Sequence, residues 1–147
     1  MSAPTDVTPD AVEPPEGFKM MTGRGEFSTR NGPYYVRSVE VGVEQAFFAA
    51  SHHCNGFGIV HGGMLAAFLD GLLAHAAHKG TDRPVVTIQL SINYLSSARK
   101  GDWVIGEARQ TRVTRDVTFV EARLHVDGRD VVRASGVFKS MDKKPTP

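Results

Sequence analysis

Asp70 is the only charged side chain in an apolar stretch that runs from Gly62 to His78. Apolar residues recur there at spacings of three and four, which predicts a helix over residues 64–78 that is apolar on nearly every side. A lone carboxylate on a buried helix is unfavourable unless it is ion-paired or hydrogen-bonded. We therefore expect Asp70 to serve as a general base or a nucleophile. The alternative is a carboxylate that faces a solvated groove or bonds nearby backbone.

Gly62 and Gly63 stand where this helix begins. Backbone N–H groups at a helix start lack intrahelical acceptors and lie at the positive end of the helix dipole, and glycine leaves room for a ligand. They are suited to an oxyanion hole for a thioester carbonyl, although such pairs also make plain turns. Asp70 follows Gly62 by about 12 Å of axial rise. That gap is long for one carbonyl to bridge within one subunit, and the helix of a second subunit could close it, with Asp70 of one chain facing Gly62 of the other.

The segments around the helix favour an α+β fold. Strand-forming residues concentrate in 34–50. Apolar and polar residues alternate over 86–94, which predicts a strand with Thr87 on the face opposite to that of Leu90 and Tyr94. Further strands are predicted at 103–113, 117–126 and 130–140, and Asp127-Gly128 is a strong hairpin signal. The order of elements predicts a meander of four successive antiparallel strands wrapped around one helix.

Composition is that of an ordinary globular protein, with 41% hydrophobic residues and a formal net charge of +1. We expect no nucleic-acid or membrane partner. The single cysteine, Cys54, excludes an intrachain disulfide, and together with the lack of a signal-like start it favours a cytoplasmic protein. We expect a flexible tail over residues 1–16, one domain over 17–141 and a frayed end over 142–147.

The sequence does not favour a metal site or a dinucleotide-binding site. His52, His53 and Cys54 are zinc-ligand types, but consecutive residues on a strand point to alternate faces, so no metal site is expected. Gly56 and Gly58 suggest a dinucleotide-binding loop. His61 stands where the third glycine should be, and no cofactor is expected.

The run HCNGFGIVHGG at 53–63, followed by Asp70, resembles the hotdog-fold acyl-CoA thioesterases. The resemblance is to the phenylacetate-degradation-type branch of the 4-hydroxybenzoyl-CoA thioesterase-like superfamily, and the stretch VTIQLSINYL at 86–95 shares it. It covers roughly residues 40–140. It implies a strongly curved antiparallel sheet around one long central helix, with two such units pairing into a dimer or tetramer that forms active sites between them.

The resemblance also implies roles for individual residues. Asp70 would activate water or attack the thioester, and the Gly62 N–H would polarise the thioester carbonyl. Asn55 would help to hold the water or the carboxylate, His61 would order the loop or contact the carbonyl, and Thr87 would help to position water. Each of the last three has a simpler alternative. Asn55 is a turn former, His61 a helix cap and Thr87 an ordinary strand residue.

An acyl-CoA substrate would need further contacts. Gly63 at the helix start and Phe57 near the acyl group belong to the predicted binding set. Arg99 and Lys100 are candidates for the coenzyme A phosphates, as are Arg112 and Arg115. The alternatives are a core position for Phe57 and an ordinary solvated turn for each basic residue. Two other functions remain open, namely a non-catalytic acyl-CoA-binding module and an acyl-CoA hydratase or dehydratase on the same fold. The latter usually pairs an acid with a histidine, and His75 lies off the helix face of Asp70.

Overall fold

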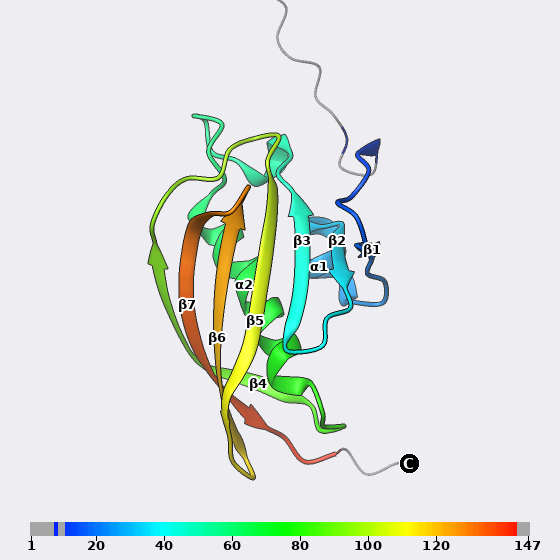
Figure 1. Ribbon diagram of the computed structural model, residues 1–147, viewed down its shortest axis with the longest axis vertical. Coiled ribbons are helices and arrows are strands. Elements are labelled where there is room, and N and C mark those ends of the chain that lie inside the picture. The colour runs from blue at the N-terminus through cyan, green and yellow to red at the C-terminus, as the bar shows by residue number, and fades with distance from the viewer. Residues whose placement is uncertain (1–7, 9–10, 144–147) are drawn as a thin grey trace, which may run out of the picture.

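The computed structural model describes residue 8 and residues 11–143, which form one antiparallel sheet and two α-helices (Figure 1). The elements, in chain order, are β1 (Lys19–Met20), α1 (Gly25–Asn31), β2 (Tyr34–Arg37), β3 (Val43–Phe48), a 3₁₀ turn η2 (Ser51–His53), α2 (Gly62–His78), β4 (Val85–Tyr94), β5 (Trp103–Val113), β6 (Val117–Val126) and β7 (Arg129–Ser140).

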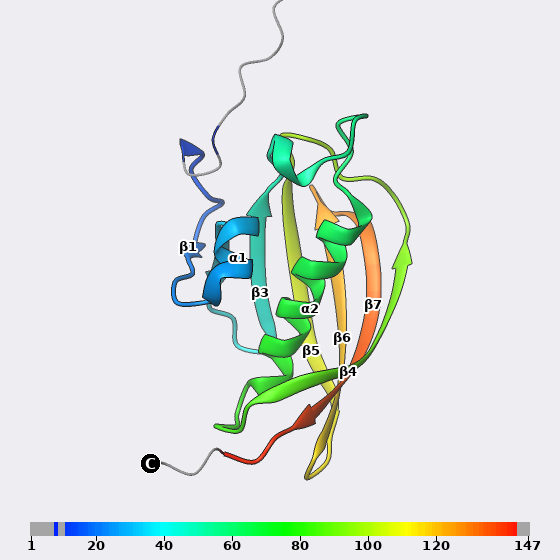
Figure 2. The same ribbon diagram turned by 180° about the vertical axis from the view of Figure 1, so that it is seen from behind.

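The sheet has seven strands in the order β1-β2-β3-β5-β6-β7-β4, and every neighbouring pair is antiparallel. It curves around α2, which lies along one face (Figure 2). This arrangement confirms the predicted α+β class, with one long helix held by a curved antiparallel sheet.

The predicted meander of four strands is wrong in one respect. Only β5, β6 and β7 follow one another, because β4 pairs with β7 and not with β5. Residues 95–102 instead cross to the loop after β3, where the Val60 N–H donates to the Ala98 carbonyl and Ile59 bridges Arg99. This crossing sets β5 beside β3 and leaves β4 at the edge of the sheet.

Helix α2 supplies the centre of the core. Its buried side chains pack against the inner face of the sheet: Met64, Leu65, Phe68, Leu69, Leu72, Leu73, Ala76 and Ala77. The helix is not covered on every side as the sequence predicted, because a strip of small residues stays half-buried: Ala66, Ala67, Asp70, Gly71 and Ala74. We call these five residues the helix strip. The helix also begins at Gly62, two residues before the predicted start.

Strand β4 contains a bulge that the period of two did not reveal. Its pairing with β7 shifts between Thr87 and Gln89, so that Ile88 is an extra residue. An extra residue reverses the face to which the following side chains point. Thr87 consequently faces α2, as do Leu90 and Ile92, which pack on the core. The predicted opposition of Thr87 to Leu90 is therefore incorrect.

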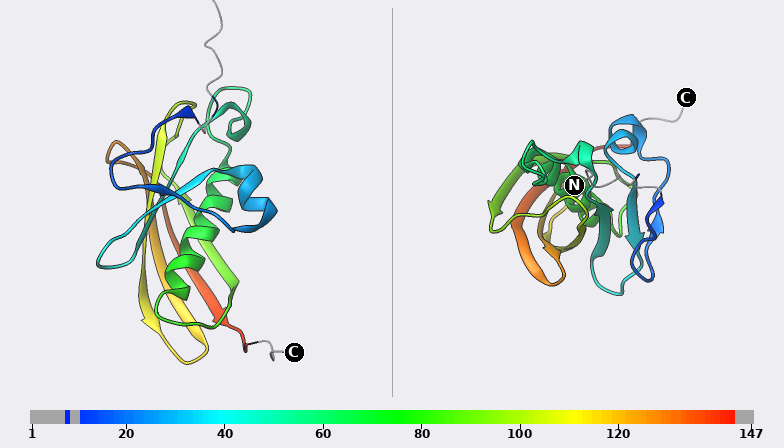
Figure 3. Two further views of the ribbon diagram at one scale, coloured as in Figure 1. Left: turned by 90° about the vertical axis from the view of Figure 1, so that its right-hand side faces the viewer. Right: turned by 90° about the horizontal axis from the view of Figure 1, so that it is seen from above.

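The segment before β2 forms a short layer of its own. Helix α1 lies beside α2 on the same side of the sheet (Figures 2 and 3), and the sequence reading did not predict it. Phe18 packs with Tyr35 and Trp103 in a second, smaller cluster. Residues 1–7, 9–10 and 144–147 lie outside the described residues, so the predicted tail, domain limits and frayed end remain predictions. Among the described residues, no helix has the length and apolarity needed to span a membrane.

Candidate active site

Asp70 and Thr87 form a hydrogen-bonded pair on the accessible side of α2. The Thr87 hydroxyl donates to Asp70 Oδ1 at 2.6 Å. The bulge in β4 makes this contact possible, because it turns Thr87 toward α2 while Leu90 and Ile92, further along the strand, also face α2. The hydroxyl fixes the orientation of the carboxylate and occupies one of its oxygens. The second oxygen, Oδ2, accepts no hydrogen bond within the described part of the chain and is left for a water or a substrate atom.

The start of α2 is capped by the residue before it. His61 Nδ1 accepts a hydrogen bond from the Gly63 N–H at 2.8 Å, which is the capping role noted as the simpler alternative. Gly62 is the first helical residue, so its N–H has no acceptor inside the helix. Tyr94 lies over this end, and its hydroxyl donates to the Gly62 carbonyl at 2.8 Å. Of the two predicted glycine amides, that of Gly62 remains available to an external oxygen.

The loop before α2 is shaped by Asn55. Its Oδ1 accepts hydrogen bonds from the N–H groups of Phe57 at 2.9 Å and Ile59 at 3.3 Å, so the side-chain carbonyl works as a turn former. Phe57 at the tip is 86% exposed. Arg99 bridges Ile59, and the Lys100 N–H donates to the Gly58 carbonyl at 2.9 Å. Phe57, Arg99 and Lys100 are thus brought to one end of the molecule.

The candidate residues fall into two groups within one chain. Asp70 and Thr87 lie halfway along α2, and Asn55, His61 and Gly62 lie at its start, about 12 Å away by helix rise. The helix strip lies between the two groups. Next to it is β4, an edge strand on which no side chain is buried and Ile88 is 57% exposed. One chain therefore carries two separate halves of the predicted site.

His75 is held away from Asp70. Its Nδ1 is 2.9 Å from Gln45 Nε2 on β3, at the opposite side of α2 from Thr87 on β4. Burial, and then the nearby cations beginning with Arg24, lower the pKa of His75, so the ring is neutral near pH 7. Asp70 and His75 therefore do not form the acid–histidine pair of a hydratase within this chain.

The histidines and Cys54 before the loop serve the fold. His53 is buried, with Nδ1 accepting from the Ala50 N–H at 3.0 Å and Nε2 lying 2.6 Å from the Asn31 carbonyl. The Cys54 thiol donates to the Ala50 carbonyl, and burial raises its pKa. No group of three or more His, Cys, Asp or Glu side chains that could hold a metal ion occurs in the part of the chain that the structure describes.

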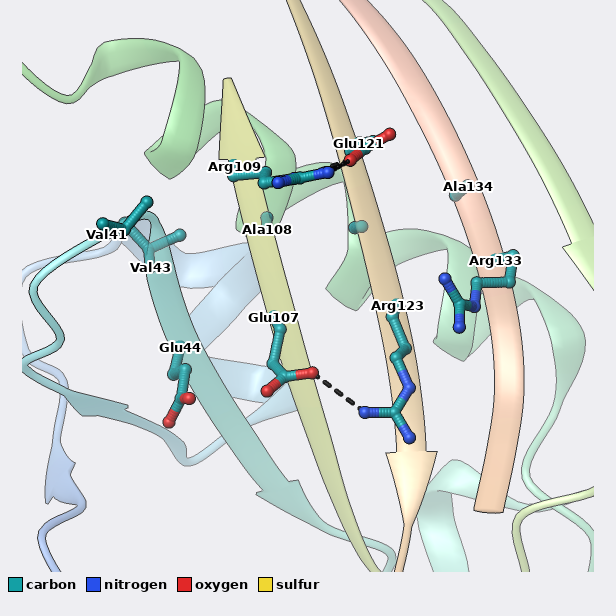
Figure 4. Close-up of a pocket in the computed structure, with 11 residues that line it drawn as sticks. Val41, Val43, Glu44, Glu107, Ala108, Arg109, Glu121, Arg123, Arg133 and Ala134 are labelled. Carbon is teal, nitrogen blue, oxygen red and sulfur yellow. Dashed lines mark hydrogen bonds and ion pairs between the residues drawn. The ribbon is translucent and has the colours of Figure 1, made fainter. Parts of the chain in front are cut away.

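A cavity of about 660 Å³ lies on the other face of the sheet, over β5, β6 and β7 (Figure 4). Its charged side chains are all ion-paired, either with one another or, for Glu44 and Arg133, with Arg37 and Asp130 beside the cavity. Arg123 contacts Glu107 at 3.1 Å, and Arg109 donates to Glu121 at 2.6 Å. Because these charges are already matched and lie across the sheet from α2, this cavity is a poor candidate for the site.

Sequence reasoning did not single out Arg24, whose guanidinium lies against α2 at Gly71. The available signal was Gly71 itself, since a glycine inside a helix costs about 1 kcal/mol relative to alanine and needs a packing reason. The role of Tyr94 at the helix start was also missed, because it depends on the bulge that turns this strand.

Comparison with known proteins identifies relatives over most of the chain. Residues 57–133 match the model of the Thioesterase superfamily. The Pseudomonas aeruginosa protein PA0474, which is named only as a candidate esterase, is 32% identical over 127 residues, covering 84% of this chain and 95% of that protein. The structure of conserved protein PA5202 from the same organism has a TM-score of 0.72 at 28% identity and covers 80% of this chain and 94% of its own.

Two further structures confirm the hotdog fold. The phenylacetic acid degradation protein PaaI from Thermus thermophilus, in a mutant form, has a TM-score of 0.70 at 22% identity, covering 78% of this chain and 98% of its own. A hypothetical thioesterase from Streptococcus pneumoniae, solved with coenzyme A, has a TM-score of 0.66 at 22% identity, covering 76% and 88%.

Proposed function

This chain belongs to the thioesterase superfamily, and we propose that it hydrolyses acyl-CoA thioesters to a free acid and coenzyme A. The observation that carries the proposal is the Asp70–Thr87 pair. In this pair the Asp70 carboxylate is oriented by Thr87 and keeps one oxygen available on the helix strip. The N–H of Gly62, at the start of the same helix, is also available. The coenzyme A bound to the Streptococcus pneumoniae relative supports this choice of thioester.

We propose further that two copies of the chain pair along β4 to complete the site. An edge strand of this length presents a row of unpaired backbone groups, which favours pairing with a second strand. The exposed Ile88 and Tyr94 and the small residues of the helix strip would be covered by such a contact. In an antiparallel pairing, Asp70 of one subunit faces Gly62 of the other, which removes the separation of about 12 Å within one chain.

In this arrangement the thioester carbonyl oxygen accepts a hydrogen bond from the Gly62 N–H. Asp70 takes a proton from water, the water oxygen bonds to the carbonyl carbon, and the negative charge on the carbonyl oxygen is stabilised by the Gly62 N–H. Collapse of this intermediate breaks the C–S bond, and the thiolate takes up the proton from Asp70. Direct attack by Asp70, giving a mixed anhydride that water then hydrolyses, would use the same groups. Thr87 orients the carboxylate in either route.

The loop residues would hold the rest of the substrate. Arg99 and Lys100 supply positive charge at the end of the molecule that carries the start of α2, which suits the phosphates of coenzyme A. The amide NH₂ of Asn55 remains for the water or the carboxylate, because its carbonyl is used within the loop. We propose a catalytic group of Asp70, Asn55, Gly62, His61 and Thr87, with His61 acting through its cap on the helix.

A panel of acyl-CoAs assayed for release of free thiol tests this function. We expect turnover by the wild type and a loss of about 10²-fold or more in kcat for Asp70→Asn. Asp127→Asn is the matched control, because Asp127 lies in the β6–β7 turn with a φ of 47°, a conformation that asparagine accepts well. Near-normal turnover by Asp70→Asn would refute the assignment. Binding without thiol release would favour a binding module, and hydration of enoyl-CoA without thiol release would favour a hydratase.

A further inference from the structure

Arg24 is a half-buried arginine that rests on α2. Its Nη2 lies 3.2 Å from the point at which a Cβ on Gly71 would stand. Within residue 8 and residues 11–143, Arg24 takes part in no ion pair and in no side-chain hydrogen bond. Withdrawal of a guanidinium from water is unfavourable unless an anion compensates for the lost hydration. This cation is therefore placed to receive an anion from outside the chain.

Gly71 makes room for this guanidinium. A glycine inside a helix is less stable than an alanine, and every other position of the helix strip except Asp70 is an alanine. A Cβ at position 71 would press on Arg24 at a distance tighter than most side-chain contacts. The absence of a side chain at Gly71 thus has a packing consequence, since it allows the guanidinium to lie directly on the helix.

Arg24 also lines a cavity of about 540 Å³ between β1, α1 and β2, with Met20, Met21 and Tyr34 in its wall. No aspartate or glutamate lines this cavity. Burial raises the pKa of Tyr34 to about 12, so its hydroxyl stays neutral, and His75 beyond Gly71 is neutral as well. The guanidinium of Arg24 is therefore a fixed positive charge in a cavity wall that holds no carboxylate and whose other arginine is Arg30.

The position of Arg24 selects the part of the substrate that it can meet. Gly71 follows Asp70 directly, and consecutive Cα atoms are about 3.8 Å apart. The phosphates of coenzyme A are separated from the thioester by the whole pantetheine arm, so they lie too far away when the carbonyl is at Asp70. The acyl group begins at that carbonyl. From there the acyl group can extend over the small residues of the helix strip, away from Thr87 and toward Arg24.

We propose that Arg24 binds a carboxylate at the far end of the acyl group, so that the enzyme favours half-thioesters of dicarboxylic acids over unsubstituted acyl-CoAs. This inference rests on the proposed hydrolysis of acyl-CoA. A guanidinium and a carboxylate form charge-assisted hydrogen bonds, and a methyl group in the same place would leave the arginine unpaired.

The test compares adipyl-CoA with hexanoyl-CoA, two six-carbon substrates that differ in a terminal carboxylate or methyl group. The measured quantity is the ratio of kcat/KM for adipyl-CoA to that for hexanoyl-CoA. We expect a ratio above one for the wild type and a ratio lowered about tenfold or more by Arg24→Met. Arg24→Lys, which keeps the charge but loses the planar fork, should give an intermediate ratio.

Arg30→Met is the matched control. Arg30 lies on α1, lines the same cavity and pairs with Glu26 at 3.7 Å, so its loss should leave the ratio unchanged. A wild-type ratio of one or below, or an equal decrease for both substrates in Arg24→Met, would overturn the inference. A change in oligomer mass for both Arg24 variants would also overturn it, because the arginine would then serve the subunit contact. Absence of thiol release from every acyl-CoA would instead refute the proposed function.

Discussion

Replacement of Gly62 by proline removes one N–H from the proposed oxyanion hole with little change to the fold. Proline is favoured at the first position of a helix, where its missing N–H has no intrahelical partner. The preceding His61 has a φ of −57° and a ψ of 133°, which is the extended conformation that a residue before proline requires. A Cβ at position 62 would meet the Tyr94 ring at 3.5 Å, an ordinary contact distance. The variant should therefore fold normally.

The effect on catalysis should nevertheless be large. Loss of a single oxyanion-hole donor lowers kcat by about 10²–10³-fold, which corresponds to about 2.7–4 kcal/mol of transition-state stabilisation. The assay is steady-state thiol release with the best substrate of the acyl-CoA panel, and thermal unfolding measured in parallel reports on the fold. Gly62→Ala, which keeps the N–H, is the matched control and should keep most of the activity. A Gly62→Pro enzyme that folds and has kcat within about twofold of the wild type would refute the role of this amide.

Three further predictions concern the carboxylate, the coenzyme A contacts and the response to pH. Thr87→Val removes the hydroxyl that orients Asp70 and should lower kcat by about tenfold, whereas Thr87→Ser should retain activity. Equal kcat values for the two variants would contradict this role of Thr87. Replacement of Arg99 and Lys100 together by alanine should raise KM by more than it changes kcat, and an unchanged KM would exclude them from the binding site. Burial lowers the pKa of three histidines below 6.5, so near that pH the unfolded chain binds protons that the folded chain does not. The free energy of unfolding should therefore fall as the pH drops below about 6.5. A thermal midpoint that is as high at about pH 5.5 as at about pH 7.5 would contradict this prediction. These histidines are His53, His75 and His125.

The sequence predicted the core elements because their signals are local. The spacing of apolar residues located α2, and the alternation after Pro84 located β4. The position of β4 in the sheet was not predictable in the same way, since it depends on the contact of residues 95–102 with the loop after β3. Strand pairing of this kind is a long-range property that periodicity does not report.

The candidate site was predictable only in part for a similar reason. Asp70 was visible as a lone charge, whereas its contact with Thr87 depends on a bulge that alternation does not reveal. Arg24 comes from a segment that has no periodic signal, and only the fold places it on Gly71. Chemistry-bearing residue types can thus be recognised locally, but their partners require the tertiary structure.

A mixture of two inactive variants tests most directly whether the active site is shared between subunits. In heterodimers of Asp70→Asn with Gly62→Pro, one of the two sites combines the intact Asp70 of one subunit with the intact Gly62 of the other. After unfolding and refolding of an equal mixture, half of the dimers are heterodimers, so activity should return to about a quarter of the wild-type value. Activity no higher than that of either parent, in a mixture shown by mass spectrometry to contain heterodimers, would contradict the shared site.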